Sequence, residues 1–308
     1  MSAAVTLLIP CYNAAGFLPR LITSVCEGSE SFSAILCYDD GSTDATINVA
    51  QELGLSILKG QRNRGVAYAR NQLAAAARTE WIHFHDADDL IGARFLERLR
   101  PACDASHDVV SCDADWLDDV SRSMLIKWRY DPAALRDAPL THLLEHSMGL
   151  NNTLIRRTAW DTIGGCDESL TMWEDSDVHI RLARSGARFH HFAEVLTYSL
   201  RRADSFSHDY RVSWTCRLAA LERYAGWQVP ADVVAALGRE AERAAGELAF
   251  YNDRANSKRA IALCQRLGRR PPTSDHLLVN LLKPFLAAYP LLRLQARRRR
   301  KSQPRRAD

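Results

Sequence analysis

The sequence lacks several features that would place it in a familiar functional class. It has no run of about 18 uninterrupted apolar residues, so we expect no membrane-spanning helix. Its eight cysteines include no CxxC pair and no metal-ligand spacing, which favours reduced structural thiols over a zinc site. The N-terminus has no basic segment and only a short apolar run, so we expect no signal peptide and a cytoplasmic protein.

Two common nucleotide-binding loops and a strong net charge are also missing. Neither GxGxxG nor GxxxxGK[ST] follows the first apolar segment, which argues against a dinucleotide fold and a P-loop. The net charge is +3, and because residues 291–308 carry eight Lys/Arg and one Asp, the first 290 residues sum to −4. A mildly acidic body with a basic tail is not typical of nucleic-acid binders, so we expect no nucleic-acid partner.

The first half of the chain alternates short apolar segments with helix-like stretches. The apolar segments contain β-branched residues and are bounded by turn residues. This alternation indicates βαβ units and a mainly parallel α/β sheet flanked by helices, a Rossmann-like arrangement. We expect extended segments at 5–10, 33–40, 55–60, 81–86, 108–114, 151–157 and 188–200, and helices at 15–28, 43–53, 65–78 and 174–186.

The C-terminal third has a different pattern. Residues 208–268 are almost wholly helical in pattern, and residues 275–306 join an apolar helix, interrupted by Pro284 and Pro290, to a cationic end. Two interpretations of this last segment stay open: a helix on an anionic membrane surface at the cytoplasmic face, or a helix docked on the body with a disordered basic tail. The expected organisation is an α/β domain over 1–207, a helical extension over 208–268, and a linker, apolar helix and basic tail over 269–308.

Acidic residues gather where strands of the expected sheet end. The stretch FHDADDL, residues 84–90, contains Asp86 and Asp88, which can aim both carboxylates at one site because residues two apart in an extended segment point to the same side. Oxygen ligands without a soft partner suit Mg²⁺ or Mn²⁺, and Mg²⁺ is usually held by one or two carboxylates plus substrate phosphates. Alternatively, Asp88 or Asp89 caps a helix through 92–100.

Two neighbouring features have open interpretations. His83 and His85 could add imidazole ligands, although such residues on a sheet face are more often packed or hydrogen-bonded. In DDGSTD (39–44), a loop in which Ser42 or Thr43 caps a helix explains most of the motif. Two adjacent acids exceed what a cap requires, and a carboxylate at a strand end could accept from a nucleobase N–H.

Together, six segments resemble the family 2 glycosyltransferases, which have the GT-A fold, over about residues 5–205. The family consists mainly of inverting enzymes that transfer a sugar from a nucleotide-diphosphate donor with a divalent metal. The segments follow the family's order: IPCYNAAGFLPRLITSV (9–25), YDDGSTDAT (38–46), NRGVAYARNQLAAAA (63–77), FHDADDLI (84–91), IGGCDESL (163–170) and WEDSDVHIRLARSG (173–186).

The resemblance implies roles for single residues. Asp86 and Asp88 match the family's DxD, with Asp88 the better direct ligand of Mg²⁺ or Mn²⁺. Asp175 matches the general base and Glu174 is the fallback, although Asp175 could instead be a helix N-cap. The residues implied to hold the nucleotide are Pro10, Tyr12, Asn13, Asp39, Asp40, Arg70 and Asp86.

Other polar residues match the family only loosely. A second Asp-Ala-Asp, at 113–115, lies one βα unit later, where Asp113 or Asp115 could help to form an acceptor cleft. In the segment 198–210, Arg201 or Arg202 could lie near the diphosphate. His85 stands where the family more often has an apolar residue.

The expected function is metal-assisted, inverting transfer from a nucleotide-diphosphate sugar, with a UDP-sugar favoured. The expected acceptor is a hydroxyl of a glycan or a lipid-linked saccharide in cell-surface polysaccharide synthesis. Two alternatives remain. A sugar nucleotidyltransferase would carry a Gly-rich loop with Arg where this chain has PCYNAAG. A catalytically inactive nucleotide-sugar-binding protein should have lost Asp86, Asp88 or Asp175, and all three are present.

Overall fold

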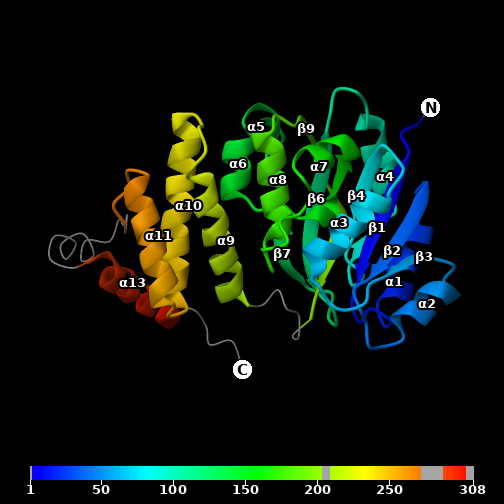
Figure 1. Ribbon diagram of the computed structural model, residues 1–308, viewed down its shortest axis with the longest axis horizontal. Helices are drawn as coiled ribbons and strands as arrows, with labels where there is room; N and C mark the ends of the chain where they lie inside the picture. The colour runs from blue at the N-terminus through cyan, green and yellow to red at the C-terminus, as the bar shows by residue number, and fades with distance from the viewer. Residues whose placement is uncertain (1, 203–208, 272–286, 303–308) are drawn as a thin grey trace. The chain divides into compact units, whose positions relative to one another are not determined.

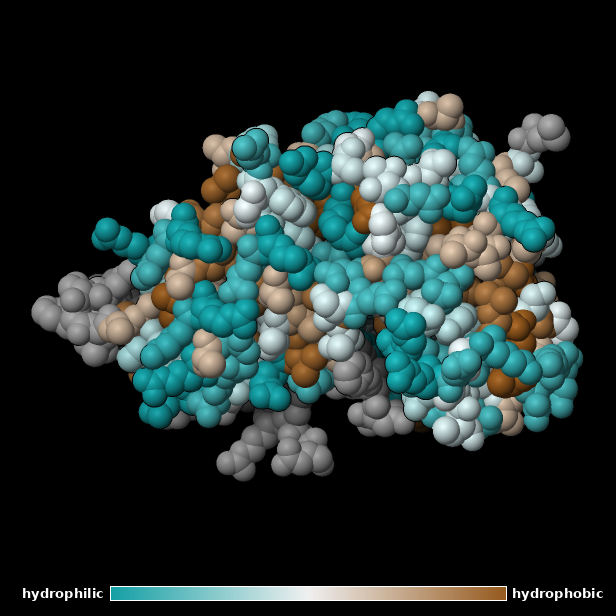
Figure 2. All heavy atoms as spheres, viewed as in Figure 1, coloured by the Kyte–Doolittle hydropathy of each residue, from teal (hydrophilic) through white to brown (hydrophobic). Residues whose placement is uncertain are grey.

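A computed structural model describes residues 2–202, 209–271 and 287–302 of the protein (Figure 1). Two compact units make up the chain, Met1–Ser205 and Phe206–Asp308. The face seen in Figure 2 is mainly hydrophilic, with apolar side chains in separate patches, as expected of a chain in which 25% of the residues are charged.

One sheet of nine strands forms the centre of the N-terminal unit. The strands are β1 (Val5–Cys11), β2 (Ala34–Asp39), β3 (Ser56–Lys59), β4 (Trp81–Phe84), β5 (Leu90–Ile91), β6 (Val109–Asp118), β7 (Met124–Trp128), β8 (Thr153–Arg156) and β9 (Phe189–Arg201). Their order is β3-β2-β1-β4-β8-β6-β9-β5, and β7 pairs with β6. Strands β1 to β4 are parallel, as the βαβ pattern predicts. Beyond β4 the pairs are antiparallel, except that β6 and β9 are parallel.

Helices connect the strands and cover the sheet (Figure 1). They are α1 (Leu18–Cys26), α2 (Thr46–Glu52), α3 (Val66–Ala76), α4 (Phe95–Leu99), α5 (Pro132–Asp137), α6 (Pro139–Glu145), α7 (Arg157–Thr162) and α8 (Glu174–Arg184). Short 3₁₀ turns lie at Arg100–Ala102 and Leu150–Asn152. The first three helices each connect two parallel strands, so the loops that enter them follow the carboxyl ends of β1, β2 and β3.

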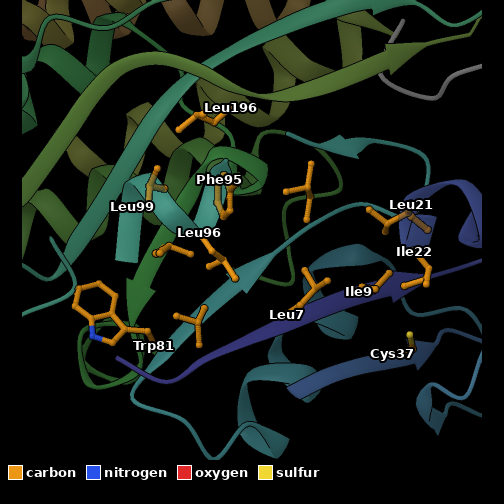
Figure 3. Packing of buried hydrophobic residues seen from close by; sticks show 14 of the residues in the cluster. Leu7, Ile9, Leu21, Ile22, Cys37, Trp81, Phe95, Leu96, Leu99 and Leu196 are labelled. Carbon is orange, nitrogen blue, oxygen red and sulfur yellow. The ribbon is translucent and has the colours of Figure 1, made fainter. Parts of the chain in front are cut away.

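A hydrophobic core fixes the start of these loops (Figure 3). Leu7 and Ile9, alternate residues of β1, belong to one buried cluster with Leu21 and Ile22 of α1 and Phe95 of α4. All five are at most 9% exposed. Full burial of each such side chain contributes about 1.5–3 kcal/mol, so the central strand is firmly held and the polar loop after it begins at a fixed point.

The C-terminal unit is helical in its described part, with α9 (Tyr210–Tyr224), α10 (Ala231–Phe250), α11 (Arg254–Arg266) and α13 (Ala288–Ser302). Asp209 and Asp253 cap α9 and α11 by accepting from the backbone N–H of Val212 and Asn256. Within this unit, α13 packs on α10 and α11.

Pro290 does not interrupt the last helix. It lies in the first turn of α13, where a backbone N–H would have no intrahelical acceptor, so its missing donor costs little. Pro284 and the rest of 275–286 lie outside the described residues. The apolar side of α13 is buried, with Leu291, Leu292 and Ala296 at most 5% exposed. Within the described ranges, no helix has the length and apolar character needed to cross a membrane.

Candidate active site

The acidic residues identified in the sequence lie at one edge of the sheet. Cys11 at the end of β1 is opposite Asp39 at the end of β2, and β4 ends two residues before Asp86. Because β1, β2 and β4 are parallel, the loops that follow them share this edge, where α/β proteins place their ligands.

Arg70 joins two of the acidic motifs. This α3 residue donates from Nη2 to Asp86 Oδ1 (2.7 Å) and from Nη1 to Glu174 Oε1 (2.5 Å). The side chains of Arg70 and Glu174 are 5% and 9% exposed, whereas that of Asp86 is 41% exposed. Burial alone would lower the pKa of Arg70, but the two carboxylates outweigh it and the pKa is raised. Arg70 is therefore a permanent cation that brings the loop after β4 to the start of α8.

Asp88 has a different cationic partner. Arg202, one residue past the end of β9, donates from Nη1 to Asp88 Oδ2 (2.9 Å), and its guanidinium lies 4.2 Å from the centre of the Phe17 ring. Burial and the nearby Asp86 raise the pKa of Asp88, while Arg202 acts in the opposite direction. Of the two arginines considered at this strand end, Arg202 reaches the acidic loop and Arg201 lies over Trp116.

The helix-cap interpretation of Asp88 and Asp89 is wrong. The helix after them, α4, has Arg94 at its N-cap position and no side-chain cap. Asp89 instead ties the acidic loop to β9: it is 7% exposed and accepts from Ser199 Oγ (2.9 Å) and the Leu200 backbone N–H (2.9 Å). The reason is topological, because β5 places the loop beside the end of β9 rather than at a helix start.

The carboxylates that remain partly exposed suit a cation shared with a substrate. The side chains of Asp86 and Asp88 are 41% and 31% exposed. Among the described residues, no three or more His, Cys, Asp or Glu side chains form a group that could hold a metal ion. Two carboxylates without a protein cage fit Mg²⁺ or Mn²⁺ that also binds substrate phosphates, and they do not fit a structural zinc site.

His83 and His85 face the core and not the acidic edge. Both are fully buried; His83 Nδ1 lies 2.8 Å from the Thr153 carbonyl oxygen, and its Nε2 lies 3.2 Å from His85 Nδ1. Burial lowers both pKa values, that of His85 to about 3, so the rings are neutral. They form a buried hydrogen-bonded pair, and the structure gives no support to the imidazole-ligand alternative.

Asp175 lies in the first turn of α8. The N-cap position is held by Trp173, without a side-chain cap, so Asp175 is not the N-cap residue. Its Oδ1 accepts from the Ser176 backbone N–H (2.7 Å). Burial, followed by the neighbouring charge of Glu174, raises the pKa of Asp175 to about 7. A carboxylate with this pKa can accept a proton near neutral pH.

The first two loops of the edge hold each other. Asn13, at a positive φ of 49°, accepts from the Thr43 backbone N–H at 2.9 Å and donates its own backbone N–H to Ser42 Oγ at 2.9 Å. Ser42 and Thr43 therefore do not cap α2, which begins at Thr46, where Asp44 accepts from both the backbone N–H and the hydroxyl.

The residues implied to bind the nucleotide differ in exposure. Tyr12 is 50% exposed, whereas Asp39 and Asp40 are buried. Asp40 accepts from the backbone N–H groups of Arg64 (2.9 Å) and Gly65 (2.7 Å), so it holds the loop before α3, and burial raises its pKa. Pro10 is half-buried.

Asn71 is a further structural residue of the edge that the sequence analysis did not identify. Its Oδ1 accepts from the Cys166 backbone N–H (2.8 Å), and its Nδ2 donates to the Cys166 carbonyl and to Glu168 Oε1 (both 3.1 Å). Adjacent residues of α3 thus hold the acids through Arg70 and the loop leading to α8 through Asn71. Asn71 directly follows Arg70 in the sequence, and this adjacent pair is the signal from which a role for Asn71 could be predicted.

The second Asp-Ala-Asp does not line an open cleft. Asp113 is 4% exposed and accepts from His191 Nε2 (3.1 Å) and the Tyr130 backbone N–H (3.3 Å). Asp115 is 7% exposed and pairs with Arg129 at 2.6 Å. Both carboxylates are engaged inside the protein, which argues against an acceptor-binding role.

Solved structures with this fold align with nearly the whole chain. Staphylococcus aureus TarS 1–349 in complex with UDP-GlcNAc aligns with a TM-score of 0.66 and 16% identity, covering 99% of this chain and 94% of that chain. The mannosyltransferase PcManGT of Pyrobaculum calidifontis, in complex with GDP-Man and Mn²⁺, aligns with a TM-score of 0.63 and 15% identity, covering 99% and 82%.

Two sequence relatives each align with about three quarters of this chain. The succinoglycan biosynthesis protein ExoU of Rhizobium meliloti is 26% identical over 259 residues, which cover 76% of this chain and 73% of that protein. The pre-mycofactocin glycosyltransferase of Mycobacterium tuberculosis is 28% identical over 238 residues, covering 74% of this chain and 47% of that protein. The aligned part therefore spans about half the length of the mycobacterial relative.

Residues 6–169, just over half of the 308-residue chain, match the family described as Glycosyl transferase family 2. In this chain, the acidic loop after β4 and the first turn of α8 are joined by Arg70 at the carboxyl edge of the sheet. The chain thus belongs to glycosyl transferase family 2 and is a glycosyltransferase with the GT-A fold.

Proposed function

We propose that the chain transfers a sugar from a nucleotide-diphosphate sugar, with a UDP-sugar favoured, to a hydroxyl group of a glycan or lipid-linked saccharide. The observation that carries the proposal is the Arg70 bridge between Asp86 and Glu174, which brings a partly exposed acidic loop to the start of α8, where burial raises the pKa of Asp175 to about 7. A nucleotide-sugar donor is supported by the complexes of TarS with UDP-GlcNAc and of PcManGT with GDP-Man.

Asp86 and Asp88 are the residues that would hold Mg²⁺ or Mn²⁺. When bound, such an ion stabilises negative charge on a diphosphate leaving group. Arg70 orients Asp86 without occupying its whole carboxylate, because the Asp86 side chain remains 41% exposed. The donor nucleotide would lie along the same edge, against Pro10, Tyr12, Asn13, Asp39, Asp40 and Arg70.

Asp175 is the better candidate for the general base of the two adjacent acids. Glu174 is engaged by the buried Arg70, whose Nη1 donates to Glu174 Oε1, so this carboxylate is less available to an acceptor hydroxyl. Asp175 has a raised pKa and can take the proton of an acceptor hydroxyl as that hydroxyl attacks the sugar. A single displacement on the face opposite the leaving group inverts the anomeric centre.

The proposed setting is polysaccharide synthesis at the cytoplasmic face of a membrane. The relative ExoU, a succinoglycan biosynthesis protein, supports the acceptor class. For the described part of 275–306, membrane attraction would come from charge, since the apolar side of α13 is buried and Arg297, Arg298 and Arg299 are exposed.

A donor panel tests the proposal. The purified protein is incubated with Mn²⁺ or Mg²⁺ and UDP-, GDP- or TDP-sugars, and release of the nucleoside diphosphate is measured with and without saccharide acceptors. We expect metal-dependent release with one donor class. Release of pyrophosphate from a nucleoside triphosphate and a sugar phosphate would instead identify a nucleotidyltransferase, and donor binding without any release would identify an inactive binding protein.

A further inference from the structure

The residue before the candidate base has an unfavourable backbone conformation. Trp173 lies in the left-handed region, with φ 67° and ψ 12°, and is 9% exposed. This conformation costs an L-residue other than glycine roughly 1–2 kcal/mol, so it persists only where surrounding contacts hold it. Because the Trp173 carbonyl accepts the Asp177 N–H (3.1 Å), its backbone also sets the direction of the first turn of α8.

A chain of hydrogen bonds holds Trp173 from outside α8. The indole Nε1 donates to Ser147 Oγ (3.0 Å), and the Tyr130 hydroxyl donates to the carbonyl oxygen of the same Ser147 (2.9 Å). The Tyr130 backbone N–H in turn donates to Asp113 Oδ1 (3.3 Å). The buried His191 ring fixes Asp113 from the other side through Nε2 (3.1 Å) and meets the Tyr130 ring edge-on.

This series of hydrogen bonds ends at Asp113 of the second Asp-Ala-Asp, a motif that has no role in the proposed chemistry. We infer that Asp113, Tyr130 and Ser147 are positioning residues that orient Asp175 through Trp173. The inference rests on the proposed function, since it needs Asp175 to act as the base. It gives the buried Asp113 a task other than acceptor binding.

The geometry explains why orientation would depend on Trp173. Asp175 is two residues further along the same helical turn, and its carboxylate accepts from its neighbour Ser176 within that turn. A change of backbone direction at Trp173 therefore moves the carboxylate with the turn. A displacement of about 1 Å at a reacting group can lower a rate roughly 100-fold.

Three substitutions separate positioning from general stability. Trp173→Phe keeps an aromatic ring but removes the N–H donor, Ser147→Ala removes the acceptor, and Ser147→Thr keeps a hydroxyl. We expect kcat to fall about 10- to 100-fold in Trp173→Phe and Ser147→Ala, with the donor KM within about twofold of wild type. Ser147→Thr should restore most of the rate.

A matched control removes a hydrogen bond far from the edge. Thr6→Val breaks the contact between the hydroxyls of Thr6 and Thr79 (2.7 Å) at the opposite end of β1. It should lower the melting temperature about as much as Trp173→Phe and Ser147→Ala do, and it should leave kcat unchanged. If Trp173→Phe and Ser147→Ala lower kcat no more than Thr6→Val does, while Asp175→Asn is inactive, the positioning inference is wrong and the proposed function still stands. If Asp175→Asn keeps its activity, the general-base role in the proposed function is wrong, and the positioning inference is rejected with it.

Discussion

The guanidinium of Arg202 lies 2.9 Å from Asp88 Oδ2, so the carboxylate that we propose as a metal ligand already has a cationic partner. The two side chains are only partly buried, at 24% and 31% exposed, and Arg202 also contacts the Phe17 ring. Asp86 is likewise paired with Arg70, but that arginine is buried and has Glu174 as a second partner. A divalent cation would therefore have to displace Arg202, rather than Arg70, or share the Asp88 carboxylate with it.

Arg202→Met should therefore strengthen metal binding in the absence of nucleotide. Removing a partly exposed competing cation is worth roughly 0.5–1 kcal/mol, which corresponds to an affinity gain of about two- to fivefold. Titration of Mn²⁺ followed by electron paramagnetic resonance measures it. Arg201→Met is the control, because Arg201 lies over Trp116. Unchanged or weaker binding in Arg202→Met would show that the arginine does not compete.

Activity should depend on the protonation of Asp175. A base with its pKa raised to about 7 is protonated and inactive below that pH, so kcat/KM should fall about tenfold per unit below pH 7 and level off above it. Because the charge of Glu174 contributes to the raised pKa, Glu174→Gln should move the acidic limb to lower pH. A pH–rate profile measures both effects, and a limb that stays in place in Glu174→Gln would assign it to another group.

Buried neutral histidines should make the fold sensitive to acid. Burial lowers the pKa values of His83, His85 and His179, those of the last two to about 3 and about 4. Below the ordinary pKa of about 6.5, the unfolded chain binds protons that the folded chain excludes, so each histidine lowers the free energy of unfolding as pH falls.

The replacement His85→Leu should remove one such contribution. Relative to this variant, wild type should lose about 2 kcal/mol between pH 7 and pH 5, since each excluded proton contributes about 1.4 kcal/mol per pH unit. Denaturant unfolding of both proteins at a series of pH values gives the difference. The difference cancels the opposite effect of buried acids such as Asp89, whose pKa is raised. A constant difference across this range would contradict the prediction.

The basic end of α13 should bind anionic bilayers by charge. Arg297→Gln together with Arg298→Gln should weaken binding to phosphatidylglycerol vesicles about 30-fold, at about 1 kcal/mol for each arginine near the surface. The double variant Lys258→Gln and Arg266→Gln removes two exposed charges from α11 and serves as the control. Co-sedimentation with anionic and zwitterionic vesicles measures binding. Equal losses in both double variants would point to net charge rather than to α13.

The sequence predicts the parallel half of the sheet because local patterns encode it. Apolar runs such as Val5–Cys11 are buried, and the turn residues after them place acidic loops at one edge. Contacts between distant residues carry no such local signal. Asp89 meets Ser199 and Leu200, and Arg202 meets Asp88, only because β9 returns beside β5.

The absence of a local signal for distant contacts also explains why the helix-cap interpretations of Asp89 and Asp175 were wrong. A carboxylate near a helix start reads as a cap in the sequence, but Asp89 and Asp175 are directed by tertiary contacts and by the left-handed Trp173. A bulky residue at positive φ cannot be expected from its type, since the surrounding hydrogen bonds must first exist.

The most direct test of the active-site assignment compares Asp88→Asn with Asp175→Asn in one donor-binding and turnover assay. Calorimetry with Mn²⁺ and the preferred nucleotide sugar gives donor affinity, and nucleoside diphosphate release gives kcat. Asp88→Asn should abolish the Mn²⁺-dependent part of donor binding. Asp175→Asn should bind donor within about twofold of wild type and lose at least roughly 100-fold in kcat. Metal-dependent binding that survives Asp88→Asn, or turnover that survives Asp175→Asn, would contradict the assignment.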